Sequence, residues 1–483
     1  MRLDELVAAA GDVRVVGDPS VEVADLAYDS RKAGPGTLFF CVVGEKRDGH
    51  EFGARVVEAG AAALVVEREL EVDVPQIVVP SARAAMAPLA ARFYGDPTAE
   101  LRVVGVTGTN GKTTTAFLVR EILEAAGIQT GLLGTVKQVV GGVEEGVERT
   151  TPEAIDLQAT FRRMLAAGDR ACAMEVSSHA LTLRRADAIR FEAALFTNLT
   201  QDHLDFHAGM EDYFQAKRRL FESGPGTAIV NVDDEYGARL AGEFECVTFS
   251  AADDGADYVA REVSFDAGGA EFAVASTDGE TRVRTGLPGH FNVANALGAF
   301  AAARALGVDA DSAAAGLAAA GRVPGRFEPI DEGQGFAVLV DYAHTPDSLE
   351  NVLLAARRLT DGRLISVFGA GGDRDRDKRP KMGRAGAELS DLAVVTSDNP
   401  RSEDPAAIVA EVVAGTGGGG AVEVEVDRRA AIALALGRAA PGDTVVIAGK
   451  GHEQGQEFEG GRRIPFDDRE VAREELRKLG SPA

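Results

Sequence analysis

The chain has 483 residues, of which 45% are apolar, and a formal net charge of −25 at pH 7. This length is enough for roughly two to four domains, each with a core of its own. The negative charge argues against a nucleic-acid partner, because phosphate backbones are bound by clustered Lys and Arg. An acidic protein can still carry a small basic pocket for an anionic metabolite. The apolar content is ordinary for a globular protein, and we expect no membrane insertion.

The N-terminus and the cysteines bear on the compartment. Residues 1–7 lack the order of a basic stretch followed by an apolar one that is typical of a signal peptide. The cysteines, Cys41, Cys172 and Cys246, are odd in number, widely spaced and set in apolar runs. This pattern favours reduced core thiols over a disulfide framework or a zinc site. We therefore expect a cytoplasmic protein.

Residues 1–97 alternate short apolar runs with helical patterns, which predicts a small α/β domain. The predicted strands are 37–43, 62–66 and 76–79, and the predicted helices are 54–58 and 82–94. The sequence Gly95-Asp-Pro-Thr98 is typical of a linker. We place the first domain boundary there, so that a second domain covers residues 98–325.

A phosphate-cradling loop begins the second domain, between the apolar run 103–106 and a helical pattern over about 113–126. Glycines let backbone N–H groups approach an anion, and the start of the helix adds positive potential. Lys112 would supply a charge, and Thr113 a hydroxyl for a magnesium ion bridging phosphates. Val106 replaces the first glycine of the strict G-x-x-x-x-G-K-[ST] pattern, so a plain glycine turn is the alternative. The predicted nucleotide-binding residues are Gly108, Thr109, Asn110, Gly111, Lys112, Thr113 and Thr114.

Polar residues follow the next predicted strands, 171–175, 193–197 and 228–232. Ligands of open α/β sheets bind beyond the carboxyl ends of the strands. Glu175 and His203 lie at such ends, and we expect them to ligate magnesium with Thr113. Because magnesium favours oxygen ligands, His203 indicates a second, less demanding divalent site near the first. A carboxylate that caps a neighbouring helix is the alternative for Glu175. Lys217 lies in a helical stretch beside two arginines and, from chemistry alone, is an ordinary helix lysine.

A β-rich insertion over about 245–287 and an alanine-rich helix from 289 precede a third domain, residues 326–483. This domain repeats strand and helix five times, with predicted strands at 337–341, 364–368, 392–396, 422–426 and 444–448. Four of the five strands end in polar clusters, which predicts a second ligand site at one sheet edge. All seven histidines of the chain lie in such clusters or in loops, which as a group favours ligand binding.

The composition of the second site favours an amino acid as its ligand. Arg401 suits bidentate recognition of a carboxylate, and Pro400 fixes its turn. Asp398 and Asn399 offer acceptors for a charged amine. Arg374 and Glu453 complete a set that matches a zwitterion, and a salt-bridged surface loop is the alternative.

Six motifs, in order along nearly the whole chain, resemble those of the Mur ligases of peptidoglycan synthesis. They are Thr107-Gly-Thr-Asn-Gly-Lys-Thr113, Glu175-Val-Ser-Ser-His179, Thr197-Asn-Leu-Thr-Gln-Asp-His203, His290-Phe-Asn-Val-Ala-Asn295, Pro324-Gly-Arg-Phe-Glu328 and Asp341-Tyr-Ala-His344. The resemblance implies three α/β domains: a small one for a UDP-sugar peptide, a central P-loop ATPase with a mostly parallel sheet, and a Rossmann-like C-terminal one for the incoming amino acid. The form Asp398-Asn-Pro-Arg401 is that of the diaminopimelate-adding members.

The resemblance also implies roles for individual residues. Lys217 matches the lysine that the family carbamylates to bind magnesium, and Lys112, Glu175 and His203 match catalytic positions. The implied ATP contacts outside the loop are Asn292, Asn295, Arg326 and Asp341. The implied contacts to the UDP-muramoyl dipeptide are Ser30, Thr150, Thr151, Ser177 and Arg185, while Leu183 replaces a glutamine that some members carry. The implied diaminopimelate contacts are Arg374, Asp398, Asn399, Pro400, Arg401, Gly449 and Glu453.

The expected enzyme is an ATP-dependent, ADP-forming acid–amino-acid ligase that uses Mg²⁺, acts on small molecules and is a monomer. ATP would phosphorylate the γ-carboxylate of D-glutamate, and the amine of diaminopimelate would displace the phosphate. A lysine-adding Mur ligase or a folylpolyglutamate synthetase is the first alternative. A non-catalytic ATP-binding switch is the alternative from a different class.

Overall fold

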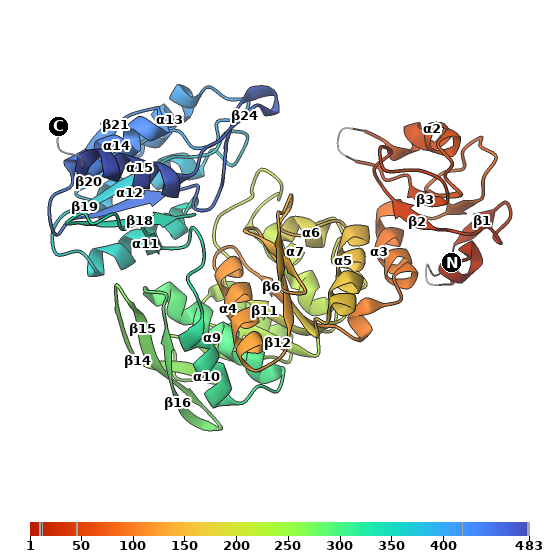
Figure 1. The fold of residues 1–483 in the computed structure, drawn as a ribbon, viewed down its shortest axis with the longest axis horizontal. Helices are drawn as coiled ribbons and strands as arrows, with labels where there is room; N and C mark the ends of the chain where they lie inside the picture. The colour runs from red at the N-terminus through yellow and green to blue at the C-terminus, as the bar shows by residue number, and fades with distance from the viewer. Residues whose placement is uncertain (9–10, 12, 45–46, 418, 481–483) are drawn as a thin grey trace. The chain divides into compact units, whose positions relative to one another are not determined.

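The computed structural model describes residues 1–8, 11, 13–44, 47–417 and 419–480 (Figure 1). Within them, the chain divides into two compact units. Unit 1 comprises Met1–Gly105, Ile128–Ala194 and Arg219–Gly226, and unit 2 comprises Val106–Gly127, Leu195–Arg218 and Thr227–Ala483. The predicted phosphate loop therefore belongs to unit 2, and Glu175 belongs to unit 1.

The N-terminal part of unit 1 is a five-stranded sheet of order β1-β5-β4-β3-β2, with β2 to β5 parallel and β1 antiparallel. Its strands are β1 (Arg14–Val16), β2 (Asp25–Ala27), β3 (Thr37–Phe40), β4 (Ala63–Val66) and β5 (Gln76–Val78), and its helices are α1 (Leu3–Val7), η1 (Gly49–Phe52), α2 (Gly53–Glu58) and α3 (Ala82–Phe93). Every residue of β3 and β4 is buried, as expected of strands covered on both faces. The three predicted strands and two predicted helices are confirmed.

The rest of unit 1 follows the short helix η2 (Pro97–Ala99). It includes β7 (Thr130–Leu133), β8 (Gln138–Val140), β9 (Val143–Glu145), α5 (Ala154–Ala167), β10 (Ala171–Glu175) and α6 (Ser178–Thr182). The strands lie in the order β10-β7-β8-β9. The Tyr28 hydroxyl donates to Asp156 of α5 at 2.7 Å, and Arg162 of α5 donates to the carbonyl oxygen of Tyr94 at 2.7 Å. These bonds attach the N-terminal sheet to α5. The sequence did not predict β7, β8 or β9.

Strands β6 (Arg102–Thr107) and β11 (Phe191–Phe196) and helix α7 (Met210–Glu222) contribute residues to both units. Unit 2 continues with α4 (Lys112–Ala125), β12 (Thr227–Asn231), α8 (Glu235–Glu243), β13 (Val247–Ser250), β14 (Tyr258–Asp266), β15 (Gly269–Ser276), β16 (Gly279–Thr285), α9 (His290–Ala305) and α10 (Ala310–Ala319). Strands β14 to β16 are antiparallel neighbours, which confirms the predicted β-rich insertion. Helix α9 packs against α4 and α10.

The C-terminal part of unit 2 is a six-stranded sheet of order β17-β18-β22-β19-β20-β21, parallel except for β17. Its strands are β17 (Glu328–Pro329), β18 (Ala337–Asp341), β19 (Leu364–Phe368), β20 (Leu392–Val395), β21 (Ala421–Val424) and β22 (Thr444–Ala448), and a hairpin of β23 (Gln456–Glu457) and β24 (Arg463–Ile464) follows. Its helices are α11 (Pro346–Arg358), α12 (Lys378–Leu389), α13 (Pro405–Val413), α14 (Arg428–Arg438), η3 (Glu459–Gly461) and α15 (Asp468–Gly480). All five predicted strands are confirmed. No helix among the described residues has the length and apolar character to cross a membrane.

A fully buried ion pair holds α14, α15 and the sheet together. Arg428 donates from Nε and Nη2 to the Asp468 carboxylate at 2.8 and 2.7 Å. Its guanidinium also donates to the carbonyl oxygens of Ser397 and Ala448, which lie at the carboxyl ends of β20 and β22. The pair therefore fixes the strand ends that carry the second predicted site.

We expect Asp468→Ala to lower the free energy of unfolding by about 3–5 kcal/mol, because it leaves the Arg428 guanidinium buried without its counter-ion. Urea unfolding followed by circular dichroism measures the change. Glu262→Ala is the matched control, since it removes an exposed partner of Arg282 and should cost less than about 1 kcal/mol. Equal losses in the two variants would contradict the assigned role.

Candidate active site

The phosphate loop joins β6 to α4 and needs glycine at two positions. Gly108 and Gly111 have φ values of +148° and +86°. A Cβ atom at Gly108 would lie 1.9 Å from Thr197 Oγ1, and one at Gly111 would lie 2.3 Å from Asn295 Oδ1. The backbone can follow this path only without side chains at these two positions. The path places the backbone amides of the loop at the start of α4.

Two lysines converge on the carbonyl oxygen of Gly108. Lys112 Nζ donates to it at 3.0 Å and to the Thr109 carbonyl at 2.8 Å, and Lys217 Nζ donates to it at 2.7 Å. Burial and the charge of Lys112 lower the pKa of Lys217 well below its usual range, although Asp202 opposes the shift. A lowered pKa favours the uncharged form of the amine, which is the nucleophilic form. The interpretation of Lys217 as an ordinary helix lysine is therefore wrong.

The loop that follows β11 supports the phosphate loop from the side. Asn198 Oδ1 accepts from the Asn110 backbone at 2.9 Å, and Thr197 Oγ1 donates to the Asn110 carbonyl at 2.6 Å. The Asn110 side chain donates to Asp347 of α11 at 2.7 Å. Thr109 Oγ1 donates to the carbonyl oxygen of Thr200 at 3.2 Å. Elements on both sides of the loop thus hold its conformation.

The other predicted nucleotide contacts lie close to this loop. Arg326 donates to Thr113 Oγ1 at 2.9 Å and stacks over the Tyr342 ring, with 4.5 Å between guanidinium carbon and ring centroid. Asn295 donates to Asn292, and both are buried in α9. Asp341 accepts from the Phe327 and Ala343 amides at 2.7 Å, and burial raises its pKa. Arg326 thus bonds directly to a hydroxyl of the phosphate loop.

His203 lies beside a buried carboxylate, Asp202, at the end of the same loop. His203 Nε2 is 3.5 Å from Asp202 Oδ2, and His203 has a positive φ of 55°. Burial alone would raise the pKa of Asp202, but the charges of His203, Lys378 and His344 hold it well below its usual range. Among the described residues, His, Cys, Asp and Glu side chains nowhere form a group of three able to hold a metal ion.

In unit 1, most of the predicted UDP-muramoyl contacts gather around the end of β10. Thr151 Oγ1 donates to the Glu175 carbonyl at 2.9 Å and accepts from the Ser177 amide at 3.1 Å. Arg185 donates to the Thr151 carbonyl and pairs with Glu153 at 2.9 Å. The Glu175 carboxylate accepts from the Thr135 amide at 2.7 Å and from its hydroxyl at 3.1 Å.

The last two predicted contacts of this set are Thr150, which belongs to the same network, and Ser30, which lies in the N-terminal part of unit 1. Thr150 Oγ1 is 3.1 Å from Thr135 Oγ1, and so joins the cluster. Ser30 follows β2 in the N-terminal sheet.

In unit 2, the second predicted site forms around the ends of β20 and β22. Asn399 Nδ2 donates to Glu453 at 2.9 Å. Gly449 has a φ of +124°, and a Cβ atom there would lie 2.4 Å from Asp398 Oδ2. That oxygen is buried and has no hydrogen-bond partner among the described residues. Arg401 donates to the Gly372 carbonyl at 2.7 Å and to Glu457 at 3.2 Å.

Lys450 is at the centre of this cluster, and the sequence did not single it out. Its buried ammonium donates to Asn399 Oδ1 and to Glu453, each at 2.8 Å, and lies 3.8 Å from Asp398. Arg374 instead donates to the Asp373 carbonyl and lies 3.7 Å from Asp205. The only signal for Lys450 was its place beside Gly449 and Glu453 after a predicted strand.

His50 is a structural histidine among the seven that favour ligand binding as a group. Its ring is buried, with Nδ1 2.5 Å from Asp48 and Nε2 accepting from the Glu67 amide at 2.9 Å. Both ring nitrogens are satisfied, as is typical of a structural histidine.

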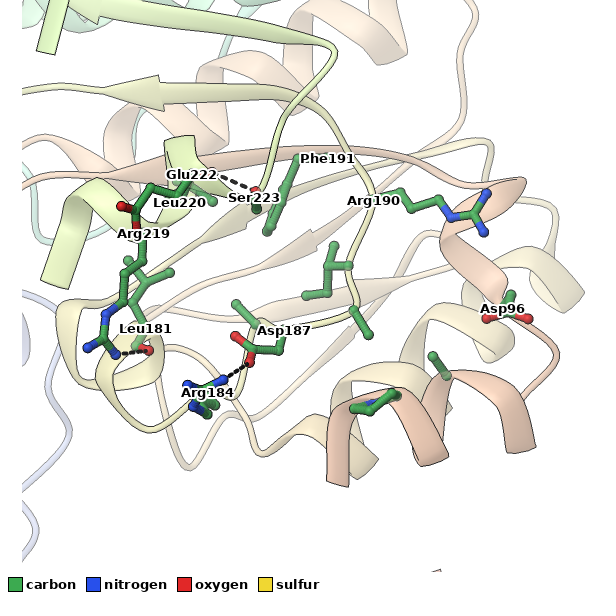
Figure 2. Close-up of a pocket in the computed structure, with 15 residues that line it drawn as sticks. Asp96, Leu181, Arg184, Asp187, Arg190, Phe191, Arg219, Leu220, Glu222 and Ser223 are labelled. Atoms are coloured by element: carbon green, nitrogen blue, oxygen red, sulfur yellow. Dashed lines mark hydrogen bonds and ion pairs between the residues drawn. The ribbon is translucent and has the colours of Figure 1, made fainter. Parts of the chain in front are cut away.

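A separate cleft of about 760 Å³ lies in unit 1, and none of the predicted site residues lines it (Figure 2). Arg184 pairs with Asp187 at 3.2 Å, and Arg219 donates to the carbonyl oxygen of Leu181 at 3.3 Å. Two of its arginines are therefore engaged with the protein, and we assign no ligand to it.

Three family models match successive parts of the chain. They are "Mur ligase family, catalytic domain" over residues 22–94, "Mur ligase middle domain" over 106–303 and "Mur ligase, glutamate ligase domain" over 325–451. A curated protein of Streptomyces coelicolor is 49% identical over 476 residues, which are 95% of this chain and 94% of that protein. The chain belongs to the Mur ligase family.

The S. coelicolor Mur ligase is named UDP-N-acetylmuramoyl-L-alanyl-D-glutamate–2,6-diaminopimelate ligase. A Gloeobacter violaceus protein of the same name is 48% identical and covers 100% of this chain and 99% of its own. A solved structure of a ligase of that name is similar, with a TM-score of 0.71 at 32% identity over 100% of both chains. A MurF structure from Acinetobacter baumannii, with a TM-score of 0.67 at 21% identity over 99% and 98% of the chains, shares the fold. The predicted family and its three-domain α/β architecture are confirmed.

We expect Gly111→Ala to weaken ADP binding more than tenfold in this Mur ligase, since the new methyl group would overlap Asn295 Oδ1 and force the loop to move. Gly127→Ala is the matched control, because Gly127 has a similar φ of +79° but nothing within 4 Å of a Cβ atom. Isothermal titration calorimetry measures both affinities. Equal weakening would mean that backbone strain, and not the close approach to Asn295, sets the effect.

Proposed function

We propose that this Mur ligase joins meso-diaminopimelate to the D-glutamate γ-carboxylate of UDP-N-acetylmuramoyl-L-alanyl-D-glutamate, with ATP as co-substrate and an acyl phosphate as intermediate. The observation that carries the proposal is the presence, in unit 2, of both a phosphate loop and a buried polar cluster in which Asp398 Oδ2 lacks a partner among the described residues. The names of the relatives from S. coelicolor and G. violaceus support the choice of substrates. Such a reaction belongs to peptidoglycan precursor synthesis, and its use of ATP favours the cytoplasm.

The phosphate loop would bind the triphosphate of ATP. Its amides at the start of α4 and the Lys112 ammonium favour negative charge, and they would stabilise charge on the phosphoryl group during transfer. Asn292, Asn295, Arg326 and Asp341 are proposed as further ATP contacts. Arg326 is already bonded to Thr113, so it would lie near the phosphates.

Magnesium would neutralise phosphate charge when bound. We propose Thr113, His203 and a carbamate on Lys217 as ligands in unit 2, and Glu175 as a magnesium ligand in unit 1. An unmodified lysine offers no anionic oxygen, so Lys217 fits the donor set only as a carbamate. The environment of Lys217 favours that modification, since its amine is fully buried and its pKa is lowered. Lys112, which also bonds Gly108, would face the resulting anion.

The cluster of Asp398, Asn399, Arg401 and Glu453 would bind diaminopimelate, with Gly449, Pro400 and Arg374 beside it. Asp398 Oδ2, which is buried and has no hydrogen-bond partner in the described part of the chain, suits an incoming ammonium group. Arg401 suits a carboxylate. The free amine would attack the acyl carbon, form the amide bond, expel phosphate and lose a proton.

The cluster in unit 1 is the proposed site for the UDP-muramoyl dipeptide. Thr151, Ser177 and Arg185 form one hydrogen-bonded network, and Thr150 joins it through Thr135. Ser30 would reach the ligand from the N-terminal sheet. We propose residues 1–97, 98–325 and 326–483 as the three domains, and a monomer as the active form.

We expect phosphate release from ATP only when the UDP-muramoyl dipeptide and meso-diaminopimelate are both present, because the amine must consume the acyl phosphate. A coupled phosphate assay and mass spectrometry of the product measure the reaction. L-Lysine in place of diaminopimelate is the control for the amino-acid site. Release with lysine would retain the ligase and reject the proposed specificity, and release with neither would reject the ligase.

We expect Lys217→Ala to lose most activity and to regain part of it with a short-chain carboxylic acid at high concentration, which would replace the carbamate oxygens. Arg218→Ala is the control, since Arg218 is the next residue of α7 and pairs with Glu243. Its activity should stay near that of the unmodified enzyme and should not respond to the acid. A fully active Lys217→Ala enzyme would reject the carbamate.

A further inference from the structure

Loop 197–209, between β11 and α7, is bonded to several elements of the C-terminal sheet within unit 2. Gln201 Nε2 donates to Asp375 at 2.8 Å, and Lys381 of α12 donates to Gln201 Oε1. Asp205 lies 3.7 Å from Arg374. Next to Gln201, Thr200 donates to Asp347, as does the phosphate-loop residue Asn110. The loop that carries His203 is thus connected to the starts of α11 and α12.

Asp202 is the buried centre of these contacts. Its side chain is 7% exposed, and three basic groups surround it. Lys378 Nζ lies 3.6 Å from Oδ1, and His344 Nε2 lies 3.6 Å from Oδ2. His203 Nε2, from the same loop, lies 3.5 Å from Oδ2. Lys378, the first residue of α12, is itself only 4% exposed.

Because Asp202 is buried, its arrangement with the three basic groups is stable only when all of them are present. A buried carboxylate is stable only when partners compensate for its lost hydration. Removing one partner leaves the remaining buried charges with an uncompensated desolvation free energy. Two of the three partners of Asp202 belong to the C-terminal sheet and its helices. Lys378 and His344 are therefore both drawn to one carboxylate of the nucleotide-binding part, and His344 is held in addition by a 2.8 Å hydrogen bond between Nδ1 and the Tyr342 carbonyl.

We propose that Asp202 is a positioning residue, which holds Lys378 and His344 against loop 197–209 and so sets the amino-acid cluster at the correct distance from the phosphate loop. Asp202 needs no contact with a reacting atom in this role. The expected effect of Asp202 on kcat rests on the proposed function, whereas its expected effect on hydrogen exchange at the start of α12 does not.

The kinetic test compares Asp202→Asn, Lys378→Met and the double variant of the full chain. Each single variant should lower kcat about tenfold or more, because the acyl phosphate and the amine would meet less often, while ADP affinity stays within about twofold. The double variant should be no slower than the slower single variant, since residues that act as a unit are not additive. Multiplied losses, or ADP affinity that falls in step with kcat, would overturn the proposal.

Hydrogen exchange provides a second test that does not depend on the ligase reaction. Peptides covering residues 374–382 should exchange faster in Asp202→Asn and in Lys378→Met than in the unmodified protein, and unchanged exchange would overturn the proposal. If the unmodified enzyme made no amide product, the proposed function would be rejected. The exchange experiment would still decide the role of Asp202. Lys378→Met keeps the test available should Asp202→Asn fail to fold.

Asp443→Asn is the matched control for the loss of a buried carboxylate. Asp443 is 5% exposed and pairs with Arg363 at 2.8 Å, immediately before β22 and away from the strand ends that carry the cluster. It should lower thermal stability without changing kcat or exchange over residues 374–382. If Asp443→Asn lost as much kcat as Asp202→Asn, the effect of Asp202 would be explained by a general loss of stability, and the proposal would be overturned.

Discussion

The carbonyl oxygen of Gly108 is the point on which the nucleotide-binding part depends. Lys112 and Lys217 both donate to it, and Thr197 Oγ1 occupies the space that a side chain at Gly108 would need. One backbone position therefore joins the ends of β6 and β11 to helices α4 and α7. A larger residue there would separate the strand ends and move both lysines, so the site is built around the absence of a side chain.

Buried charge organises the rest of unit 2. Arg428 is paired with Asp468 beneath the ends of β20 and β22, and Lys450 is held by Asn399 and Glu453 above them. Isolated, each of these groups would cost several kcal/mol to bury. Because each is compensated by partners on other strands or helices, the polar cluster forms only when the sheet has its correct strand order. Stability and ligand binding are thus supplied by the same contacts.

Local pattern predicted those parts of the molecule that depend on neighbours in sequence. The glycine turn before Lys112 and the strands that end at Glu175 and Asp341 were all predicted from short windows. The polar ends of β20 and β22 were also predicted, because turn residues follow apolar runs. Their meeting was expected from the rule that parallel strands end at one edge, and the contact of Asn399 with Glu453 confirms it.

What the sequence could not predict depends on contacts between distant segments. The burial of Lys217 is invisible in a polar helix such as α7, because it arises from the approach of Gly108. Two partners of Asp202, His344 and Lys378, follow β18 and β19, and the strand order β18-β22-β19 brings both to the same loop. Lys450 illustrates the chemical consequence. Its charge offsets one of the two carboxylates, Asp398 and Glu453, and Arg401 adds a second cation that is already bonded to the Gly372 carbonyl and to Glu457. A cluster with that balance favours a zwitterionic amino-acid end over a plain amine.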